Sequence, residues 1–213
     1  MTSAYDNAYL RQARASLARA FDYAVNVEGC ELEHFCAMFI NTGIAHRFQR
    51  GDAHTLAGQS GVELAREVLA CQPDYKPRPA RYELDRSPEY WTGWALAHYQ
   101  WKSALPFERI FRAVSVGQML TMYQMYHEMD ISQFIDNMDA LIRKAESISR
   151  LKELRLRAGM SQRQVAESSG VPLRSVQQYE QRQKSINRAS FDTVIALAKA
   201  VYCSDPTELM EID

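Results

Sequence analysis

The sequence has no long apolar run, and this absence excludes one class of protein. None of its hydrophobic stretches approaches the roughly 18–20 residues that a membrane-spanning helix needs. The first residues, MTSAYDNAYLRQ, hold no basic segment followed by an apolar core, so we expect no secretory signal. Four widely spaced cysteines favour reduced thiols over a disulfide framework: Cys30, Cys36, Cys71 and Cys203. We therefore expect a cytoplasmic protein.

A convincing strand pattern is also absent, whereas apolar residues recur at helical spacing along most of the chain. The sequence therefore predicts an all-α fold. The expected helices cover about 4–27, 31–41, 44–49, 62–70, 88–102, 107–114, 116–128, a stretch from Ser132, the region described below, 191–201, and a short one after Asp205. Gly29 interrupts the first of these, and Ser87 followed by Pro88 starts the helix over 88–102. Its aromatics on all sides predict that it forms the buried centre of the N-terminal region.

Two connections are predicted to be structured. Residues 71–87 hold three prolines and no periodicity, and we expect an ordered surface connection that its two tyrosines and its leucine anchor. Neither Pro nor Gly occurs between Ser132 and Ala158. We therefore expect the last N-terminal helix to continue, or to bend slightly, into the next unit without a flexible linker.

The net charge of −1 hides a strong asymmetry. Residues 1–149 carry 15 basic and 18 acidic side chains, a net of −3. Residues 150–188 carry 9 basic and 3 acidic side chains, a net of +6, and residues 189–213 carry 1 and 5, a net of −4. The positive charge is concentrated on one stretch, as a surface that binds phosphates requires.

Within that stretch, residues 160–182 read MSQRQVAESSGVPLRSVQQYEQR. Two short helical patterns, with Val165 and Ala166 on one and Val176 and Tyr179 on the other, flank a turn in which we expect Gly170 to adopt positive φ. The second pattern presents a row of donors and amides: Arg174, Ser175, Gln177, Gln178, Gln181 and Arg182. A solvated face usually mixes Glu with Lys, whereas this chemistry reads base edges and phosphates. The pattern indicates a DNA-reading helix-turn-helix.

Residues from about 150 to 211 resemble the XRE family, the helix-turn-helix domain of phage Cro and CI-type repressors. The residues that carry the resemblance are LKELRLRAGMSQRQVAESSGVPLRSVQQYE and SFDTVIALAKAVYCSDPTEL. It implies a five-helix DNA-binding domain. Residues 1–145, including SGVELAREV and SPEYWTGWALAHYQW, resemble the long N-terminal regions of bacterial helix-turn-helix regulators, a resemblance that supplies no biochemical role.

The XRE resemblance also implies roles for individual residues. Gln162 would touch the DNA backbone and brace the recognition helix, and Arg155 and Glu180 would form a structural pair. The predicted DNA-binding residues are Gln162, Arg163, Leu173, Arg174, Ser175, Gln177, Gln178, Arg182, Lys184 and Arg188. Of these, Leu173, Arg174, Ser175 and Gln178 would meet base edges, and Arg182, Lys184 and Arg188 would meet phosphates.

The sequence departs from the family pattern in two places. Pro172 stands where the family usually has a capping Ser or Thr, and the segment after Glu180 is about two residues longer than usual. We expect an N-terminal domain over 1–147 and the DNA-binding domain over 148–213.

Three other residue groups could carry chemistry, but each also has a plainer explanation. Cys30, His34 and Cys36 have no usual zinc spacing and no fourth ligand, which favours core cysteines and a surface histidine. A row of Met119, Met122, Met125 and Met129, with Trp91, Trp94 and Trp101, either lines a small-molecule pocket or, more commonly, fills a core. His98, His127 and Glu128 match no catalytic motif. We expect no enzymatic activity, no cofactor and no metal.

The sequence thus predicts a transcriptional regulator, a dimeric repressor whose C-terminal helix-turn-helix enters the major groove of double-stranded DNA. Its N-terminal domain would serve dimerisation or bind an effector or a partner protein. The alternative is an antitoxin-type autorepressor whose N-terminal domain chiefly binds a partner protein. We expect a homodimer in a bacterial cytoplasm, without membrane association.

Overall fold

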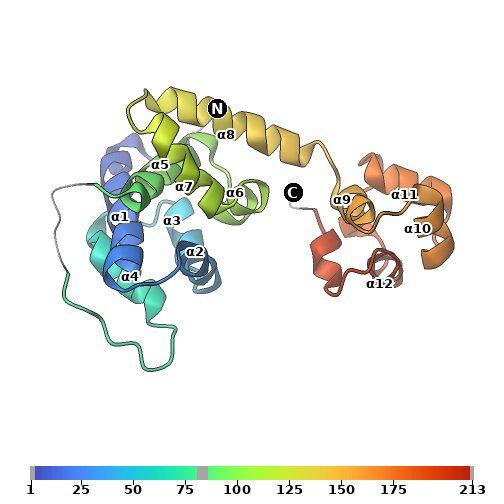
Figure 1. The fold of residues 1–213 in the computed structure, drawn as a ribbon, viewed down its shortest axis with the longest axis horizontal. Helices are drawn as coiled ribbons and strands as arrows, with labels where there is room; N and C mark the ends of the chain where they lie inside the picture. Colours follow the sequence, from blue (N-terminus) through green and yellow to red (C-terminus); the bar gives the residue numbers. More distant parts are fainter. Residues whose placement is uncertain (1–2, 81–85, 212–213) are drawn as a thin grey trace. The chain divides into compact units, whose positions relative to one another are not determined.

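A computed structural model describes residues 3–80 and 86–211 of the chain. Within these ranges the backbone forms helices, turns and loops but no strand, which confirms the all-α fold (Figure 1). The chain divides into two compact units, Met1–Ile142 and Arg143–Asp213. No helix in the described ranges is both long and apolar enough to cross a bilayer.

The first unit is a helical assembly whose members follow one another through short connections. Its α-helices are α1 (Leu10–Asp22), α2 (Leu32–Asn41), α3 (Ile44–Gln49), α4 (Gly61–Leu69), α5 (Pro88–Ser103), α6 (Phe107–Ala113), α7 (Val116–Tyr126) and α8 (Ile131–Glu146), of which the last turn belongs to the second unit. A short 3-10 helix, η1 (Asn7–Tyr9), precedes α1. Each helix lies within a few residues of its predicted range.

The centre of this unit is the pair α1 and α5, which make the most extensive helix–helix contact in the molecule. The axes approach closely because α5 has a glycine at the crossing: a Cβ on Gly93 would lie 2.6 Å from the carbonyl oxygen of Leu17. Ser87 caps α5 as predicted, accepting a hydrogen bond from the backbone N–H of Tyr90 at 3.0 Å. The prediction of aromatics buried on all sides was wrong in detail, since the three tryptophans of α5 are only partly buried. Small and aliphatic residues fill its buried face, together with Tyr99.

An aromatic cluster joins α2, α3 and α6. The rings of Phe39, Phe48 and Phe107 meet edge to face, with centroids 5.2 to 6.2 Å apart, and all three are completely buried. Such pairs contribute about 0.5–1.5 kcal/mol beyond the area that they bury. This cluster joins residues that are up to 68 positions apart in the sequence, from Phe39 to Phe107.

Two π-helical turns were not predicted. The first, η2 (Tyr23–Val27), continues α1 to the interruption at Gly29, and the second, η3 (His54–Gly58), precedes α4. A π-helical turn has no simple pattern of residue types, so neither turn could be predicted from the sequence.

The connection after α4 is anchored by the carboxylate of Glu28. This carboxylate accepts hydrogen bonds from the Tyr75 hydroxyl at 2.8 Å, the Tyr23 hydroxyl at 2.6 Å and the backbone N–H of Arg78 at 2.9 Å. Tyr75 is therefore one of the expected anchors. The other two, Tyr82 and Leu84, lie outside the described residues.

The second unit is a smaller set of short helices with its own core. It contains α9 (Arg150–Arg157), α10 (Gln162–Ser169), α11 (Leu173–Glu180), η4 (Ile186–Arg188), α12 (Phe191–Ala200) and η5 (Pro206–Leu209). The core is aliphatic, with Tyr179 at its edge, and includes Leu151, Leu154, Val165, Val176, Leu197 and Leu209. The expected last α-helix is instead a single 3-10 turn, which Asp205 caps.

The prediction of a continuous or slightly bent helix between the two units was wrong. α8 ends at Glu146, and α9 begins anew at Arg150. Ser149 caps α9 by accepting a hydrogen bond from the backbone N–H of Lys152 at 3.3 Å. A serine at this position offers an alternative partner to the backbone, so neither Pro nor Gly is needed to end the helix.

Candidate nucleic-acid interface

The helix-turn-helix is built from α10, α11 and the turn between them. Gly170 ends α10 with φ 71°, the left-handed conformation that the sequence predicted. Val165 and Val176 are fully buried, which confirms the apolar sides assigned to the two helices. At the start of α10, Ser161 and Gln164 form a reciprocal capping box, with bonds of 3.2 and 2.7 Å. Both ends of α10 are therefore defined, the first by the capping box and the second by Gly170.

A buried ion pair braces the end of α11 against α9. Arg155 donates from Nε and Nη2 to the two carboxylate oxygens of Glu180 at 2.6 and 3.1 Å, and it also donates to the carbonyl oxygen of Met160 at 2.8 Å. Gln162 adds a bond from Nε2 to Oε2 of Glu180 at 2.7 Å. This network confirms the structural pairing of Arg155 with Glu180 and the bracing part of the role assigned to Gln162.

The opposite side of α11 is open and polar. Arg174, Gln177, Gln178 and Gln181 fall within a sector of about 100° at the helical repeat, away from the buried Val176. Arg174 is exposed, and the two glutamines within α11 are partly exposed. Ser175 and Leu173 lie partly exposed beside this sector in the first turn. The face can thus offer one guanidinium and several amides to a nucleic acid without disturbing the core.

Pro172 occupies the N-cap of α11 and supplies no side-chain cap, as expected from the sequence. Its carbonyl oxygen accepts the N–H groups of Ser175 at 2.8 Å and Val176 at 3.1 Å. The fixed φ of proline sets the direction of entry into the helix.

Three of the predicted phosphate-contacting residues lie in the segment after α11, and the structure separates them. Lys184 and Arg188 are exposed, and Nζ of Lys184 lies 5.4 Å from the ring centroid of Tyr179. Arg182 turns away: its guanidinium donates to the carbonyl oxygens of Glu146 and Ile148 and pairs with Glu211 at 3.1 Å. These bonds give Arg182 a structural role in the second unit, and its phosphate contact stays a prediction.

The contacts of Arg182 belong to a larger clasp that the sequence did not reveal. We use clasp for Arg182, Asn187, Glu211 and the backbone of 146–150. Glu211 also accepts the backbone N–H of Arg150 at 2.8 Å, and its own backbone makes two bonds with the Asn187 side chain, at 2.6 and 2.8 Å. No sequence signal indicated it, since partners far apart in the chain and backbone acceptors leave no motif.

Ion pairs compensate part of the net charge of +6 on residues 150–188, and only the cations without a pair are available to a ligand. Four of the nine basic residues of 150–188 pair with carboxylates: Arg150, Arg155, Arg157 and Arg182. Among the described residues, the other five make no ion pair: Lys152, Arg163, Arg174, Lys184 and Arg188. Arg163 lies in the first turn of α10, Arg174 in the first turn of α11, and Lys184 and Arg188 in the loop that follows. The uncompensated charge therefore concentrates around the helix-turn-helix.

This fold and this charge distribution define a helix-turn-helix DNA-binding unit. Residues 151–203, about a quarter of the 213-residue chain, match the sequence model of a protein family described as Helix-turn-helix, which confirms the resemblance to XRE-family domains. No curated protein matches the chain, and no solved structure does. The family match therefore lies within the C-terminal unit and does not extend to the first unit.

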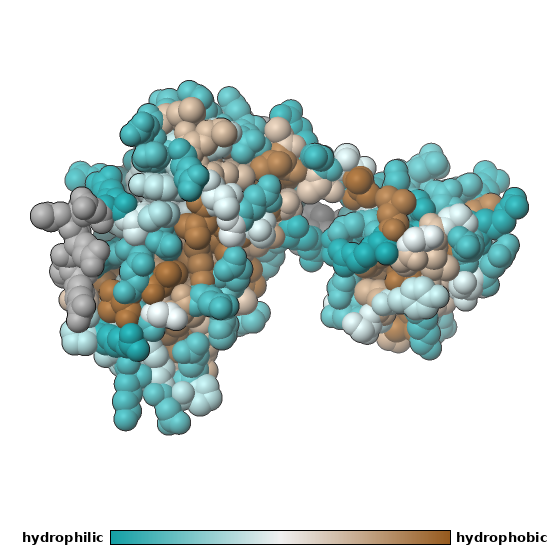
Figure 2. Space-filling model, viewed as in Figure 1, coloured by the Kyte–Doolittle hydropathy of each residue, from teal (hydrophilic) through white to brown (hydrophobic). Residues whose placement is uncertain are grey.

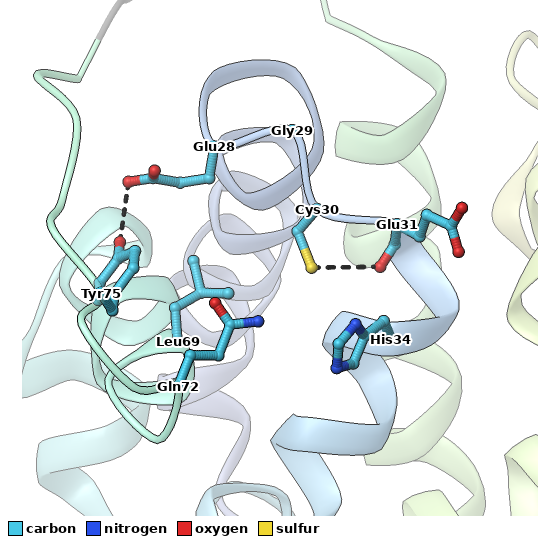
Figure 3. Close-up of a pocket in the computed structure, with 8 residues that line it drawn as sticks. All are labelled: Glu28, Gly29, Cys30, Glu31, His34, Leu69, Gln72 and Tyr75. Carbon is cyan, nitrogen blue, oxygen red and sulfur yellow. Dashed lines mark hydrogen bonds between the residues drawn. The ribbon is translucent and has the colours of Figure 1, made fainter.

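A cavity of about 340 Å³ in the first unit is lined by Glu28, Gly29, Cys30, Glu31, His34, Leu69, Gln72 and Tyr75 (Figure 3). Cys30 and His34 lie on one side of it, with Leu69 and Gln72 opposite, whereas Cys36 is buried in the core. Among the described residues, no three potential ligand side chains gather into a metal site. The Cys30 thiol donates to the carbonyl oxygen of Glu31 at 3.4 Å, and burial raises its pKa.

The residues of the methionine and tryptophan row do not line this cavity. Met119 and Met122 are buried in the core, whereas Met125 and Met129 are exposed. His98 lies between Trp94 and Trp101, and its Nδ1 is 3.2 Å from Nη1 of Arg14. Burial, with the Arg14 charge, lowers the pKa of His98 to about 4.

Proposed function

We propose that the protein is a sequence-specific transcriptional regulator that binds double-stranded DNA as a homodimer in the bacterial cytoplasm and represses transcription. Each copy would place α11 in the major groove. Two copies on two-fold related half-sites would supply the affinity that one small module lacks.

One observation carries this proposal: the family match and the uncompensated cations fall on the same helices. Arg174 and Gln178 stand one turn apart on the open face of α11, while Arg163, Lys184 and Arg188 flank it. Side chains at the centre would meet base edges, and those at the margin would neutralise phosphates. The open face of α11 thus combines amides with one guanidinium, and further cations stand on the neighbouring segments.

Selection of bound duplexes from a random pool, followed by fluorescence anisotropy, tests DNA binding directly. We expect the full-length protein to enrich a related set of sequences and to bind them more tightly than a random duplex at the same salt concentration. Failure to bind any duplex at low salt would contradict the proposal.

The residue assignments are tested with the double change Arg174→Ala and Gln178→Ala. It should weaken binding to the selected duplex by about tenfold or more, because base-edge contacts are lost, and weaken binding to a random duplex less. An equal loss on both duplexes would show that these side chains do not read sequence.

Lys184→Ala provides the contrasting case. Loss of one phosphate contact should weaken both duplexes alike and reduce the slope of log affinity against log salt by about 0.9. Arg157→Ala is the matched control, because Arg157 is equally charged but pairs with Glu153 at 3.1 Å. We expect a smaller change of slope for it.

A second function is favoured by the exposure of Met125 (61%) and Met129 (45%) at the end of α7. Large apolar side chains in solvent mark protein contacts, which would suit an antitoxin-type autorepressor that binds a partner protein. Co-purification of a neighbouring gene product that is lost in Met125→Ser/Met129→Ser, but kept in Gln124→Ser, would support this alternative. Unchanged co-purification in the double variant would exclude this surface.

A further inference from the structure

A buried carboxylate and a cavity meet in the first unit. The cavity of about 340 Å³ is lined in part by Glu28, whose side chain is only 7% exposed. Three other lining residues, Gly29, Glu31 and His34, are exposed, so the cavity opens to solvent. Apolar residues reach the surface of the first unit at several places (Figure 2), so apolar surface alone does not single out a binding site. A buried charge at the wall of a cavity is the more specific feature.

The two carboxylate oxygens of Glu28 differ in their partners. Oε1 accepts all three hydrogen bonds, from the hydroxyls of Tyr23 and Tyr75 and from the backbone N–H of Arg78. Oε2 accepts none from the described residues, yet it is not sealed from solvent. Its ion pair among these residues is with Nε of Arg78, at 4.0 Å, on a side chain that is 65% exposed. That separation is too long for a hydrogen bond, so Oε2 is open to a further donor.

The Glu28 carboxylate is charged at neutral pH. Burial alone would raise its pKa, but hydrogen bonds from Tyr23, from the backbone of Arg78 and from Tyr75 outweigh the burial and hold the pKa below its usual value. A buried charge is costly unless it is both paired and hydrogen-bonded. The open Oε2 leaves part of this cost uncompensated, so a cation that reaches it gains a strong partner.

The helix ends around the cavity also favour a cation. η2 ends at Val27, directly before Glu28, and carbonyl groups at the C-terminus of a helix carry partial negative charge. α2 begins beside the cavity with the opposite end of its dipole, but two carboxylates, Glu31 at its N-cap and Glu33 in its first turn, offset that end. None of the described residues that line the cavity is a lysine or an arginine. The cavity therefore favours a cation over an anion.

The kind of cation follows from the donors that the cavity lacks. A calcium ion takes six to eight oxygen ligands, whereas no three potential ligand side chains of the described residues gather at one place. A quaternary ammonium group has no N–H to donate and is usually held by several aromatic rings, whereas Tyr75 is the single aromatic residue among the described lining residues. A protonated amine fits instead, because its N–H groups can donate to Oε2 and its charge can pair with the carboxylate.

The other walls set the size and shape of such a ligand. Leu69 offers an apolar surface, and Gln72 points its amide into the space between Leu69 and His34 (Figure 3). Neither the Gln72 amide nor the His34 ring makes a hydrogen bond with a described residue. At roughly 30 Å³ for each water, the cavity corresponds to about ten waters, which is enough for a short aliphatic chain with a polar group at each end.

We infer that this cavity binds a short aliphatic primary amine, whose ammonium group donates to Oε2 of Glu28 and whose chain lies against Leu69. A hydroxyl or second amine at the far end of the chain would meet the amide of Gln72. The inference goes beyond the proposed DNA binding and does not depend on it, because every lining residue belongs to the first unit.

Calorimetry on the full-length protein tests the ligand class. The probes are aminopentanol, with its two groups at opposite ends of the chain, its N-trimethyl derivative, and pentanediol. We expect aminopentanol to bind at one site in each chain, and the other two to bind at least about tenfold more weakly, because one has no N–H donor and the other no charge. Equal affinities for the amine and the diol, or no binding of the amine at millimolar concentration, would overturn the inference.

Two variants test the position of the site. Glu28→Gln keeps an oxygen for the two tyrosines but removes the charge, and it should weaken amine binding about tenfold or more. Glu31→Gln is the matched control, because the Glu31 carboxylate points away from the cavity (Figure 3), and it should bind the amine almost as the wild type does. Cys30→Phe fills the cavity while Glu28 keeps its partners, so it still decides the question if Glu28→Gln does not fold. Wild-type affinity in Cys30→Phe would overturn the inference.

Thiol protection places the ligand in the wild-type protein. Cys30 lines the cavity, and Cys203 in the second unit is the internal control: both thiols are partly buried, both donate to a carbonyl oxygen, and burial raises the pKa of both. The protein is treated with N-ethylmaleimide, and the modified peptides are quantified by mass spectrometry. Saturating aminopentanol should slow the modification of Cys30 and leave that of Cys203 unchanged. Unchanged modification of Cys30 would overturn the inference, whereas a protein that binds the amine but no DNA would overturn only the proposed function.

Discussion

The two units use polar side chains in opposite ways. In the first unit they are turned inward: Glu28 binds two tyrosines and a backbone N–H, and His98 sits between tryptophans beside Arg14. In the second unit the buried charged side chains of the described residues are Arg155 and Glu180, and five cations without ion pairs among the described residues lie outside the core. These polar groups of the first unit stabilise its own fold, whereas the five unpaired cations of the second unit are available to a ligand.

The largest difference between the two units is expected from Arg155→Met. It leaves the Glu180 carboxylate buried without its cation, which should destabilise the second unit by about 3–5 kcal/mol. All three tryptophans lie in the first unit, so tryptophan fluorescence should show an unchanged transition, while circular dichroism shows an earlier unfolding of part of the helix. Arg157→Met, at an exposed ion pair, should change stability by less than about 1 kcal/mol. If both probes shift together, the two units unfold as one.

The converse change is Gly93→Ala in α5. Its Cβ would lie 2.6 Å from the Leu17 carbonyl oxygen, so α1 and α5 must separate, at a cost of about 1–3 kcal/mol to the first unit. Here the fluorescence transition should move while DNA binding at low temperature stays intact. Ala37→Val, which adds volume at an exposed position of α2, is the control. An unchanged fluorescence midpoint would mean that the two helices do not define this core.

A smaller effect is expected at the turn of the helix-turn-helix. Gly170→Ala forces a Cβ into the left-handed conformation, with no other atom within 4 Å, so only backbone strain of about 1–2 kcal/mol should appear. Gly170→Asn should cost less, because asparagine tolerates this conformation better. Circular dichroism of the full-length protein measures both. Equal losses would indicate that strain at this residue is not the cause.

The smallest expected effect concerns pH. Burial, with Arg14 nearby, lowers the pKa of His98 from 6.5 to about 4, so the folded first unit binds this proton less readily than the unfolded chain. Stability from this group is therefore complete above pH 6.5 and declines as pH falls towards 4. Between these values, His98→Gln should show a shallower loss of the fluorescence midpoint than the wild type. Parallel pH profiles would exclude His98 as a contributor.

Local chemistry explains what the sequence could predict. Ser87, Ser161 and Asp205 act on N–H groups two or three residues away, so their capping roles follow from adjacent residue types. The helix-turn-helix was recognisable for the same reason: Gly170 and the apolar residues around it lie within about twenty positions. Ser149 carried the same capping signal, which would have located the break before α9.

Long-range contacts explain what the sequence could not predict. The acceptors of Arg182 are backbone carbonyl oxygens more than thirty residues earlier, and any residue could provide them. Met125 and Met129 continue the spacing of the buried Met119 and Met122, yet α7 ends beyond the edge of the core and leaves them in solvent. In both cases the tertiary environment, rather than residue type, decides the role.

The clasp makes one residue, Glu211, important for the position of two distant segments. Glu211 is near the end of the sequence, yet it holds both the start of α9 and the loop that carries Lys184 and Arg188. A substitution of Glu211 is therefore expected to disturb the segment that carries Lys184 and Arg188, although neither of these proposed phosphate-contacting residues is altered. The residues that meet here come from three segments, 146–150, 182–187 and Glu211, so Glu211 links parts of the second unit that lie about 60 positions apart in the sequence.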